Sequence, residues 1–203
     1  AEIPLPEAID RKLLCPFHYF GVSDDVDLHD IKWSRGGYDK AALSNIYTGN
    51  DIRVMLILKE LNKYVTDIDK VKGLGFCVSK EHAAYMALRF NQNNISSIAL
   101  TADSKKDERD SAQSRLAKGE IKFIFTVDLY NEGVDIPEVN TVMFLRPTES
   151  LTVFLQQLGR GLRLSEGKEC LTVLDFIGQA HVKYNFESKF AALLGNTQRS
   201  VKD

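Results

Sequence analysis

The chain has 203 residues, of which 44% are hydrophobic and 27% charged, and its formal net charge is −2. These values are typical of a soluble globular protein, and the length suffices for one α/β domain with an additional arm. A net charge so close to zero excludes a generally basic protein, so any contact with nucleic acid must come from local groups. The sequence contains no apolar run long enough to cross a bilayer, and residues 1–10 do not resemble a signal peptide, so we expect no membrane partner.

The N-terminal part has no clear hydrophobic period. We expect a short helix over residues 5–14 and helices over residues 39–47 and 52–64, with a turn where two glycines follow one another near residue 36. We interpret residues 1–37 as an arm that packs on the domain or on a missing neighbour, and residues 38–203 as the domain itself.

Acidic residues, cysteines and histidines are the candidate metal ligands in the sequence. The aspartates within residues 24–27 are compatible with a metal site, but a solvated loop is the favoured interpretation because Asp-rich turns are common. The three cysteines have no CxxC spacing and the four histidines no zinc-type spacing, so we expect no metal site. Reduced thiols in a cytoplasmic protein are the simplest account of the cysteines.

From about Lys72 onward, short apolar runs alternate with helical patterns. The predicted strands cover residues 75–79, 95–100, 121–126, 141–145 and 170–176. The predicted helices between them cover residues 80–91, 105–118 and 150–163. Strands separated by helices of this length favour βαβ units and a mostly parallel, doubly wound sheet. In such sheets ligands bind beyond the carboxyl ends of the strands, which directs attention to the segments that follow each strand.

The most informative segment is Gln156–Arg163. Gln156, Arg160 and Arg163 are separated by four and three residues, so on an α-helix they fall within a sector of roughly 60°, with the apolar residues on the other side. Two guanidinium groups held on a packed helix suit a polyphosphate, because each planar fork can donate two hydrogen bonds to phosphate oxygens. An ordinary amphipathic helix with solvated arginines is the alternative that this segment alone leaves open.

A second segment, Thr126–Pro137, follows a predicted buried strand. It combines hydroxyl, amide and carboxylate groups with a glycine, and a proline ends its regular structure. Considered by itself, it is more often a polar connection capped by Thr126 or Asp128.

Together, these segments resemble the C-terminal RecA-like domain of superfamily 2 helicases and translocases. Phe76–Lys80 resembles motif IV of that family, Thr126–Pro137 motif V and Gln156–Arg163 motif VI, and Thr101–Ser104 is similar to a stretch between them. The resemblance covers roughly residues 52–180, and the run from Phe144 into Gln156 is most similar to the branch with type III restriction subunits and nucleotide-excision-type helicases. It implies a RecA-like doubly wound, mostly parallel sheet with helices on both faces, plus the N-terminal arm.

The resemblance implies that Arg160 and Arg163 are arginine fingers. They would reach across a cleft to the γ-phosphate of ATP held by a partner domain and offset charge on the transferring phosphoryl group. Asp135 would accept a hydrogen bond from the ribose, and Gly133 would allow close backbone approach. The implied ATP-contacting residues are Gly133, Asp135, Gln156 and Gly159.

The resemblance also implies contacts with a nucleic-acid backbone. The implied residues are Ser79, Lys80, Thr101, Thr126, Val127 and Asp128. Contacts of this kind are largely independent of base sequence and need few lysines, which agrees with the net charge of −2. The expected partner is nucleic acid, DNA rather than RNA.

Half of such a motor has no counterpart in the sequence. There is no GxxxxGK[ST] phosphate loop, since Gly167-Lys168 is followed by Glu169, and no apolar strand ends in Asp-Glu. ATP and Mg²⁺ would therefore be bound mainly by a missing N-terminal RecA-like domain of the same polypeptide, from which residues 1–37 would be the linker, and the isolated chain would be inactive. A non-catalytic interaction or regulatory domain on the same scaffold is the alternative, which has no chemical need for the paired arginines.

Overall fold

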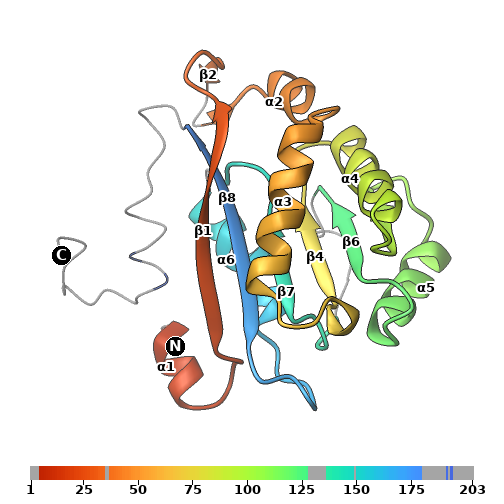
Figure 1. Cartoon of the computed structure of the whole chain (residues 1–203). Coiled ribbons are helices and arrows are strands. Elements are labelled where there is room, and N and C mark those ends of the chain that lie inside the picture. Colours follow the sequence, from red (N-terminus) through yellow and green to blue (C-terminus); the bar gives the residue numbers. More distant parts are fainter. Residues whose placement is uncertain are drawn as a thin grey trace.

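The protein is built on one parallel β-sheet. The computed structural model describes residues 5–34, 37–127, 136–148, 150–179, 191 and 193. The sheet has six strands in the order β1-β8-β7-β4-β6-β5, and every neighbouring pair is parallel (Figure 1). The strands are β1 (Phe17–Asp27), β4 (Gly73–Phe76), β5 (Ser97–Leu100), β6 (Phe123–Thr126), β7 (Thr141–Phe144) and β8 (Leu171–Gln179). The predicted parallel, doubly wound sheet is confirmed.

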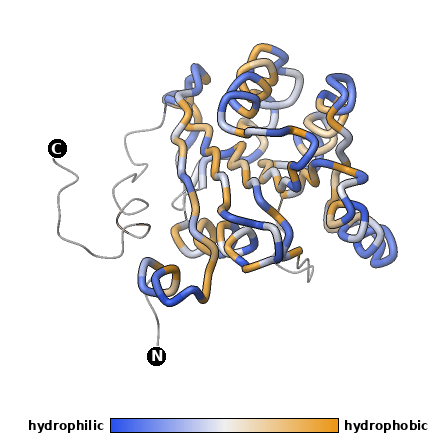
Figure 2. Tube along the Cα trace, turned by 60° about the horizontal axis from the view of Figure 1, so that its bottom comes forward, coloured by the Kyte–Doolittle hydropathy of each residue, from blue (hydrophilic) through white to orange (hydrophobic). Residues whose placement is uncertain are grey.

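Helices cover both faces of this sheet. The helices are α1 (Leu5–Asp10), α2 (Lys40–Tyr47), α3 (Asp51–Tyr64), α4 (Lys80–Gln92), α5 (Lys106–Ala117) and α6 (Leu151–Gly161), with a short 3-10 turn at Ile68–Lys70. One hydrophobic cluster packs α3 and α4 against one face, and a second packs α5 and α6 against the other. The first pair lies in front of the sheet and α6 behind it in Figure 1. Hydrophobic residues accordingly concentrate in the interior of the fold, and hydrophilic ones along the outer helices (Figure 2).

The central strands are buried on both sides. All four residues of β4, of β6 and of β7 are buried, as expected for the middle of a covered parallel sheet. Gly73 and Gly75 of β4 leave room for two aromatic rings of β6, because a Cβ at Gly73 would lie 2.1 Å from the ring of Phe123 and one at Gly75 2.4 Å from that of Phe125. This close packing of glycine against phenylalanine fixes the register between the two strands.

The edge strand β1 was not predicted. Residues of β1 pair with β8 from Phe17 opposite Leu171 to Ser23 opposite Ile177, and the hydroxyl of Tyr19 donates a hydrogen bond to Asp175 at 2.5 Å. This part of the expected arm is therefore a strand of the domain's own sheet. The interpretation of the aspartates in residues 24–27 as a solvated loop is wrong, because they lie on β1 and Asp24 is only 3% exposed.

A hairpin and α2 lie at the carboxyl end of the sheet. The strands β2 (Trp33–Ser34) and β3 (Gly37–Tyr38) pair antiparallel, and the chain then enters α2, which lies above the sheet near its carboxyl edge (Figure 1). Side chains of α2 and of the hairpin region form a third, smaller hydrophobic cluster with Val78. The domain boundary near residue 37 stays a prediction.

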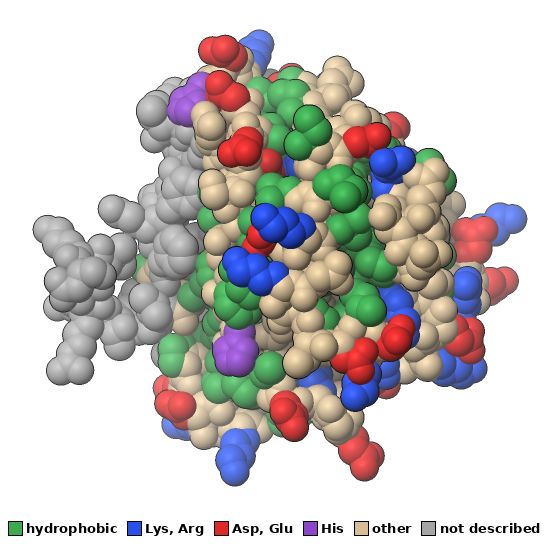
Figure 3. Space-filling model, in the orientation of Figure 1, with side chains coloured by type: hydrophobic (Ala, Val, Ile, Leu, Met, Phe, Trp, Pro, Cys, Tyr) green, Lys and Arg blue, Asp and Glu red, His purple; other side chains and the backbone are tan. Residues whose placement is uncertain are grey.

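The surface carries no dominant charge on the face covered by α3. Lys, Arg, Asp and Glu side chains are interspersed there (Figure 3). The described residues include no helix long and apolar enough to cross a membrane. Local groups, rather than the overall field of the protein, therefore have to provide any recognition of an anion.

Candidate functional site

The carboxyl ends of three neighbouring strands gather most of the residues predicted to contact nucleic acid. Ser79 and Lys80 follow β4, Thr101 follows β5, and β6 ends at Thr126 with Val127 next in the chain. Since β4, β6 and β5 are adjacent in the sheet, these five residues line one cavity of about 720 Å³. The sixth predicted residue, Asp128, lies outside the described residues.

The hydroxyl groups in this cavity differ in how far they are already engaged. Ser79 Oγ caps α4 by accepting from the backbone N–H of His82 at 3.1 Å, and it lies 2.6 Å from Ser44 Oγ of α2. Thr101 Oγ1 accepts from the backbone N–H of Asp103 at 3.3 Å. Thr126 is 1% exposed, and its Oγ1 has no hydrogen-bond partner within the described part of the chain. A buried hydroxyl in that state is costly, so Thr126 has an unused capacity to bind a ligand.

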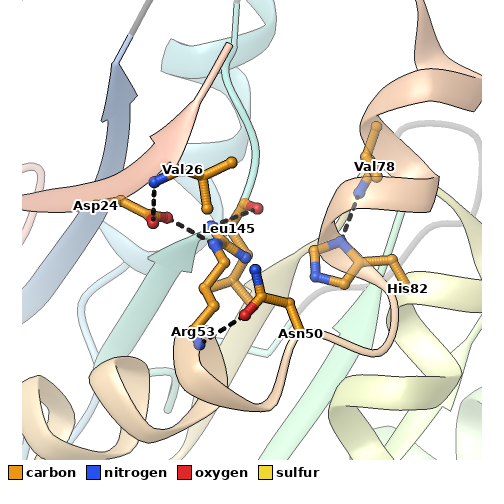
Figure 4. A network of polar contacts seen from close by, with 7 residues as sticks. All are labelled: Asp24, Val26, Asn50, Arg53, Val78, His82 and Leu145. Carbon is orange, nitrogen blue, oxygen red and sulfur yellow. Dashed lines mark hydrogen bonds and ion pairs between the residues drawn. The ribbon is translucent and has the colours of Figure 1, made fainter.

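A buried ion pair lies under this edge of the sheet (Figure 4). Arg53 Nε of α3 donates to Asp24 Oδ2 of β1 at 2.6 Å, and Arg53 Nη2 donates to the carbonyl oxygen of Leu145 at 3.0 Å. Both side chains are 2% exposed, and the guanidinium lies 4.1 Å from the centre of the Tyr47 ring. Arg53 thereby connects β1, α2 and the end of β7.

His82 supports the same edge from α4. Burial, assisted by the nearby Arg53 charge, lowers the pKa of His82 to about 3. The ring is therefore neutral at physiological pH, and its Nδ1 accepts from the backbone N–H of Val78 at 3.3 Å (Figure 4). The His82 ring also stacks on Tyr47 with ring centres 5.4 Å apart. Neither Arg53 nor His82 was predicted, because a single polar side chain in a helical pattern carries no signal of burial.

The residues predicted to act on ATP, which are Gln156, Arg160 and Arg163, lie on and just beyond α6. The helix starts with Ser150 as its cap, accepting from the backbone N–H of Val153 at 3.3 Å, and ends at Gly161. Gln156 is exposed and Arg160 half-buried on the helix, whereas Arg163 is exposed beyond the helix end. The prediction of a helix to residue 163, with all three side chains in one sector, is therefore wrong for Arg163. Two glycines in the last turn weaken the helix there.

The end of α6 is held by Lys168. Its Nζ donates to three carbonyl oxygens, at 2.6 Å for Gly161, 2.8 Å for Arg163 and 3.1 Å for Pro137. Burial lowers the pKa of Lys168. The ammonium group thus satisfies backbone carbonyls that the helix end leaves open and ties them to the chain that leads into β7. In the sequence, Lys168 stands out only as part of an incomplete phosphate loop, Gly167-Lys168-Glu169.

The residues predicted to contact nucleic acid and the end of α6 lie at opposite ends of the parallel strands. Lys168 lines a separate cavity of about 690 Å³ together with Lys72, Asn140 and Cys170, which directly precede β4, β7 and β8. The arginines of α6 are therefore not brought into the carboxyl-edge cavity. Gly133 and Asp135, predicted to contact ATP, lie outside the described residues, and Gly159 lies half-buried in the last turn of α6. Among the described residues there is no group of three side chains suited to hold a metal ion.

Comparison with known proteins identifies the domain. The family described as the helicase conserved C-terminal domain matches residues 55–165, more than half of the chain. The chain belongs to this family. Its match spans α4, β6 and α6 and so includes the three segments that resemble motifs IV, V and VI.

Relatives of this helicase C-terminal domain are parts of larger proteins. The Saccharomyces cerevisiae protein IRC3, named as an ATP-dependent helicase, is 31% identical over 176 residues, which are 87% of this chain and 25% of IRC3. A 51.5 kDa protein of a Lactococcus phage is 26% identical over 165 residues, covering 81% of this chain and 35% of the phage protein. The chain thus spans a quarter to about a third of the length of these two relatives.

Solved structures share the fold. A fragment of an HsdR subunit of a type I restriction enzyme from Vibrio vulnificus matches with a TM-score of 0.63 at 22% identity, over 91% of this chain and 35% of that one. The Escherichia coli DEAD-box protein SrmB matches with a TM-score of 0.55 at 17% identity, over 81% of this chain and 78% of that one. The resemblance to the C-terminal RecA-like domain of superfamily 2 helicases is confirmed, and the relatives include both restriction-enzyme subunits and RNA helicases.

Proposed function

We propose that this helicase C-terminal domain is the second motor domain of an ATP-dependent helicase or translocase. The observation that supports it most directly is that a chain of this family gathers five predicted nucleic-acid residues in one cavity while its arginine-bearing helix end is anchored elsewhere on the same sheet. A motor of this kind needs both surfaces, because one must follow the nucleic acid while the other responds to ATP.

Arg160 and Arg163 would act on ATP bound between this domain and the N-terminal RecA-like domain of the same polypeptide. Arg163 is exposed and Arg160 half-buried in this domain, and the guanidinium group of arginine suits an anionic triphosphate. ATP supplies the phosphoryl group, with Mg²⁺ held mainly by the other domain. Each guanidinium would offset negative charge on the transferring phosphoryl oxygens, a contribution that is largest in the transition state.

The carboxyl-edge cavity would contact the sugar-phosphate backbone of one strand. Its hydroxyl groups at Ser79, Thr101 and Thr126 can donate to phosphate oxygens or accept from sugar hydroxyls, and Lys80, which also lines the cavity, adds a positive charge. The ion pair between Lys80 and Asp103 reduces that charge. We therefore propose contacts that recognise the backbone and are insensitive to base sequence, with DNA as the favoured substrate.

The decisive experiment measures ATP turnover and ATP binding separately in the full-length protein. Arg163→Ala is expected to lower turnover by about 10³-fold while changing the affinity for ATP little, since a finger acts mainly on the transition state. Arg115→Ala, which removes an exposed arginine of α5, is the matched control and should leave both unchanged. Equal losses of binding and turnover would assign Arg163 a ground-state role, and robust hydrolysis by this chain alone would contradict the proposal.

A further inference from the structure

We propose that α2 forms the second wall of the nucleic-acid groove and contacts the sugar-phosphate backbone through Lys40 and Asn45. This inference rests on the proposed function and extends its binding surface beyond the segments that resemble helicase motifs. The helix α2 lies outside residues 55–165, the part of the chain that matches the family. Family membership therefore does not assign any role to it.

The cavity at the carboxyl edge is shared between the strand ends and α2. Four residues of α2 line it, opposite the residues that follow β4, β5 and β6. The α2 residues are Lys40, Ala41, Ser44 and Asn45. The 2.6 Å contact between Ser44 Oγ and Ser79 Oγ joins the two walls. A volume of about 720 Å³ lies in the range of cavities that hold a small organic ligand. One nucleotide unit of a nucleic-acid strand is comparable in size to such a ligand.

The side chains on both walls suit a sugar-phosphate chain. Ala41 and Val127 present apolar surface that matches the carbon face of a pentose, while Lys40 and Asn45 add donors for phosphate oxygens. Glu81 also lines the cavity and offsets the charge of one of its two lysines, Lys40 and Lys80, so binding cannot depend on a strong field. The buried Thr126 hydroxyl provides an independent indication of a ligand, because it lines the same cavity and has no partner within the described residues.

The orientation of α2 is fixed by its own sequence. Asp39 caps the helix by accepting from the backbone N–H of Ala42 at 2.8 Å, and Leu43 and Tyr47 are buried on another face of the helix. Residues four apart lie on one face of a helix, so Lys40 and Ser44 are directed to the cavity together. The lining residues of α2 are thus held in place without a ligand, and no rearrangement is needed for binding.

The test compares variants of the full-length protein in binding a fluorescein-labelled single strand, one arm with oligo-dT and one with oligo-rU of equal length. Lys40→Ala should weaken binding about 3- to 10-fold at low salt. The slope of the logarithm of the binding constant against the logarithm of the salt concentration should become shallower by about one, as expected for the loss of one phosphate contact. Lys59→Ala, which removes an exposed lysine from α3, is the charge-matched control and should bind as the unaltered protein does. A second variant, Asn45→Asp, changes shape little but places a negative charge in the groove, and should weaken binding at least as much as Lys40→Ala.

The outcomes separate this inference from the proposed function. If Thr126→Val weakens binding while Lys40→Ala and Asn45→Asp do not, α2 is not part of the groove, although the strand ends are. If the protein binds neither strand, the proposed function itself fails. Equal effects of Lys40→Ala and Lys59→Ala would also overturn the inference, because they would reflect net charge alone. The two strand chemistries show whether the groove distinguishes DNA from RNA.

Discussion

The carboxyl ends and the amino ends of the parallel strands are supported in different ways. The carboxyl edge rests on buried polar side chains, with Arg53 paired to Asp24 and bonded to the carbonyl of Leu145, and neutral His82 bonded to Val78. The end of α6, near the amino edge, depends instead on backbone carbonyls gathered by the half-buried Lys168. At the carboxyl edge the side chains of Asp24, Arg53 and His82 are buried. At the end of α6, by contrast, Arg163 stays exposed although Lys168 binds its backbone carbonyl.

This difference matches the tasks proposed for the two surfaces. A groove that binds a nucleic-acid strand benefits from a rigid floor. Buried charge networks provide that rigidity, but the loss of one member strongly lowers stability. A finger that must reach a ligand on another domain has to remain accessible, so its support has to come from the backbone next to it. Substitutions in the two supports should therefore have effects of different size and kind.

The largest effect is expected from Arg53→Met. The substitution leaves Asp24 buried at 2% exposure with no counter-ion, and the free energy of unfolding should fall by about 3–5 kcal/mol. Denaturant unfolding of the variant measures this loss. The double variant Asp24→Leu with Arg53→Met removes both charges and should recover much of it. A loss below about 1 kcal/mol for the single variant, the range of an exposed ion pair, would show that the carboxyl edge does not depend on this pair.

The next largest effect distinguishes the two glycines of α6. A Cβ at Gly161 would lie 2.6 Å from Leu171 Cδ1 and 3.0 Å from Val142 Cγ2, so Gly161→Ala should lower the free energy of unfolding by about 1–3 kcal/mol. At Gly159, no side chain or other segment of the described structure comes within 4 Å of such a Cβ. Gly159→Ala should therefore raise stability by up to about 1 kcal/mol through helix propensity.

Thermal or denaturant unfolding of both variants without ATP checks this pair. Similar effects of the two substitutions would mean that α6 does not pack as closely on β7 and β8 as the structure shows. ATP binding by Gly159→Ala is a separate measurement, since that residue is predicted to lie near the nucleotide.

Much of the architecture is readable from the sequence, for identifiable reasons. Central parallel strands are apolar on both faces, so β6 and β7 are recognisable as continuous hydrophobic runs, and the polar residues that follow them mark the carboxyl edge. The edge strand β1 could not be predicted in this way, because its inward-facing positions alternate with exposed ones but include the buried Asp24, and two further aspartates follow.

The residues that support the site could not be predicted from the sequence, for a different reason. Asp24 and Arg53 are 29 residues apart, and their pairing is set by how β1 and α3 meet in three dimensions. Lys168 looks like a surface lysine in the sequence, because the three carbonyl groups it binds carry no sequence signature. Arg163 was misplaced onto the helix because spacing alone cannot locate the end of a helix that terminates at a glycine.

A small loss of stability, but a selective change in activity, is expected from Lys168→Met. Three carbonyl groups lose a donor, and because the site is only partly buried and water can replace it, the free energy of unfolding should fall by about 1–2 kcal/mol. The backbone at Arg163 also loses its anchor, so turnover of the full-length protein should fall while ATP affinity stays nearly constant. Denaturant unfolding and steady-state ATP hydrolysis measure the two effects.

Lys72→Met is the matched control for that experiment. Lys72 Nζ also donates to a backbone carbonyl at the amino edge, that of Ala117 at 2.6 Å, but within the described part of the chain it donates no hydrogen bond to α6. Its loss should cost a comparable or smaller amount of stability and leave turnover per folded molecule unchanged. If both lysine variants lowered turnover equally, the effect would follow stability in general. A reduction confined to Lys168→Met would show that backbone contacts at the end of α6 control the reach of Arg163, because only there does a lost carbonyl contact adjoin the arginine.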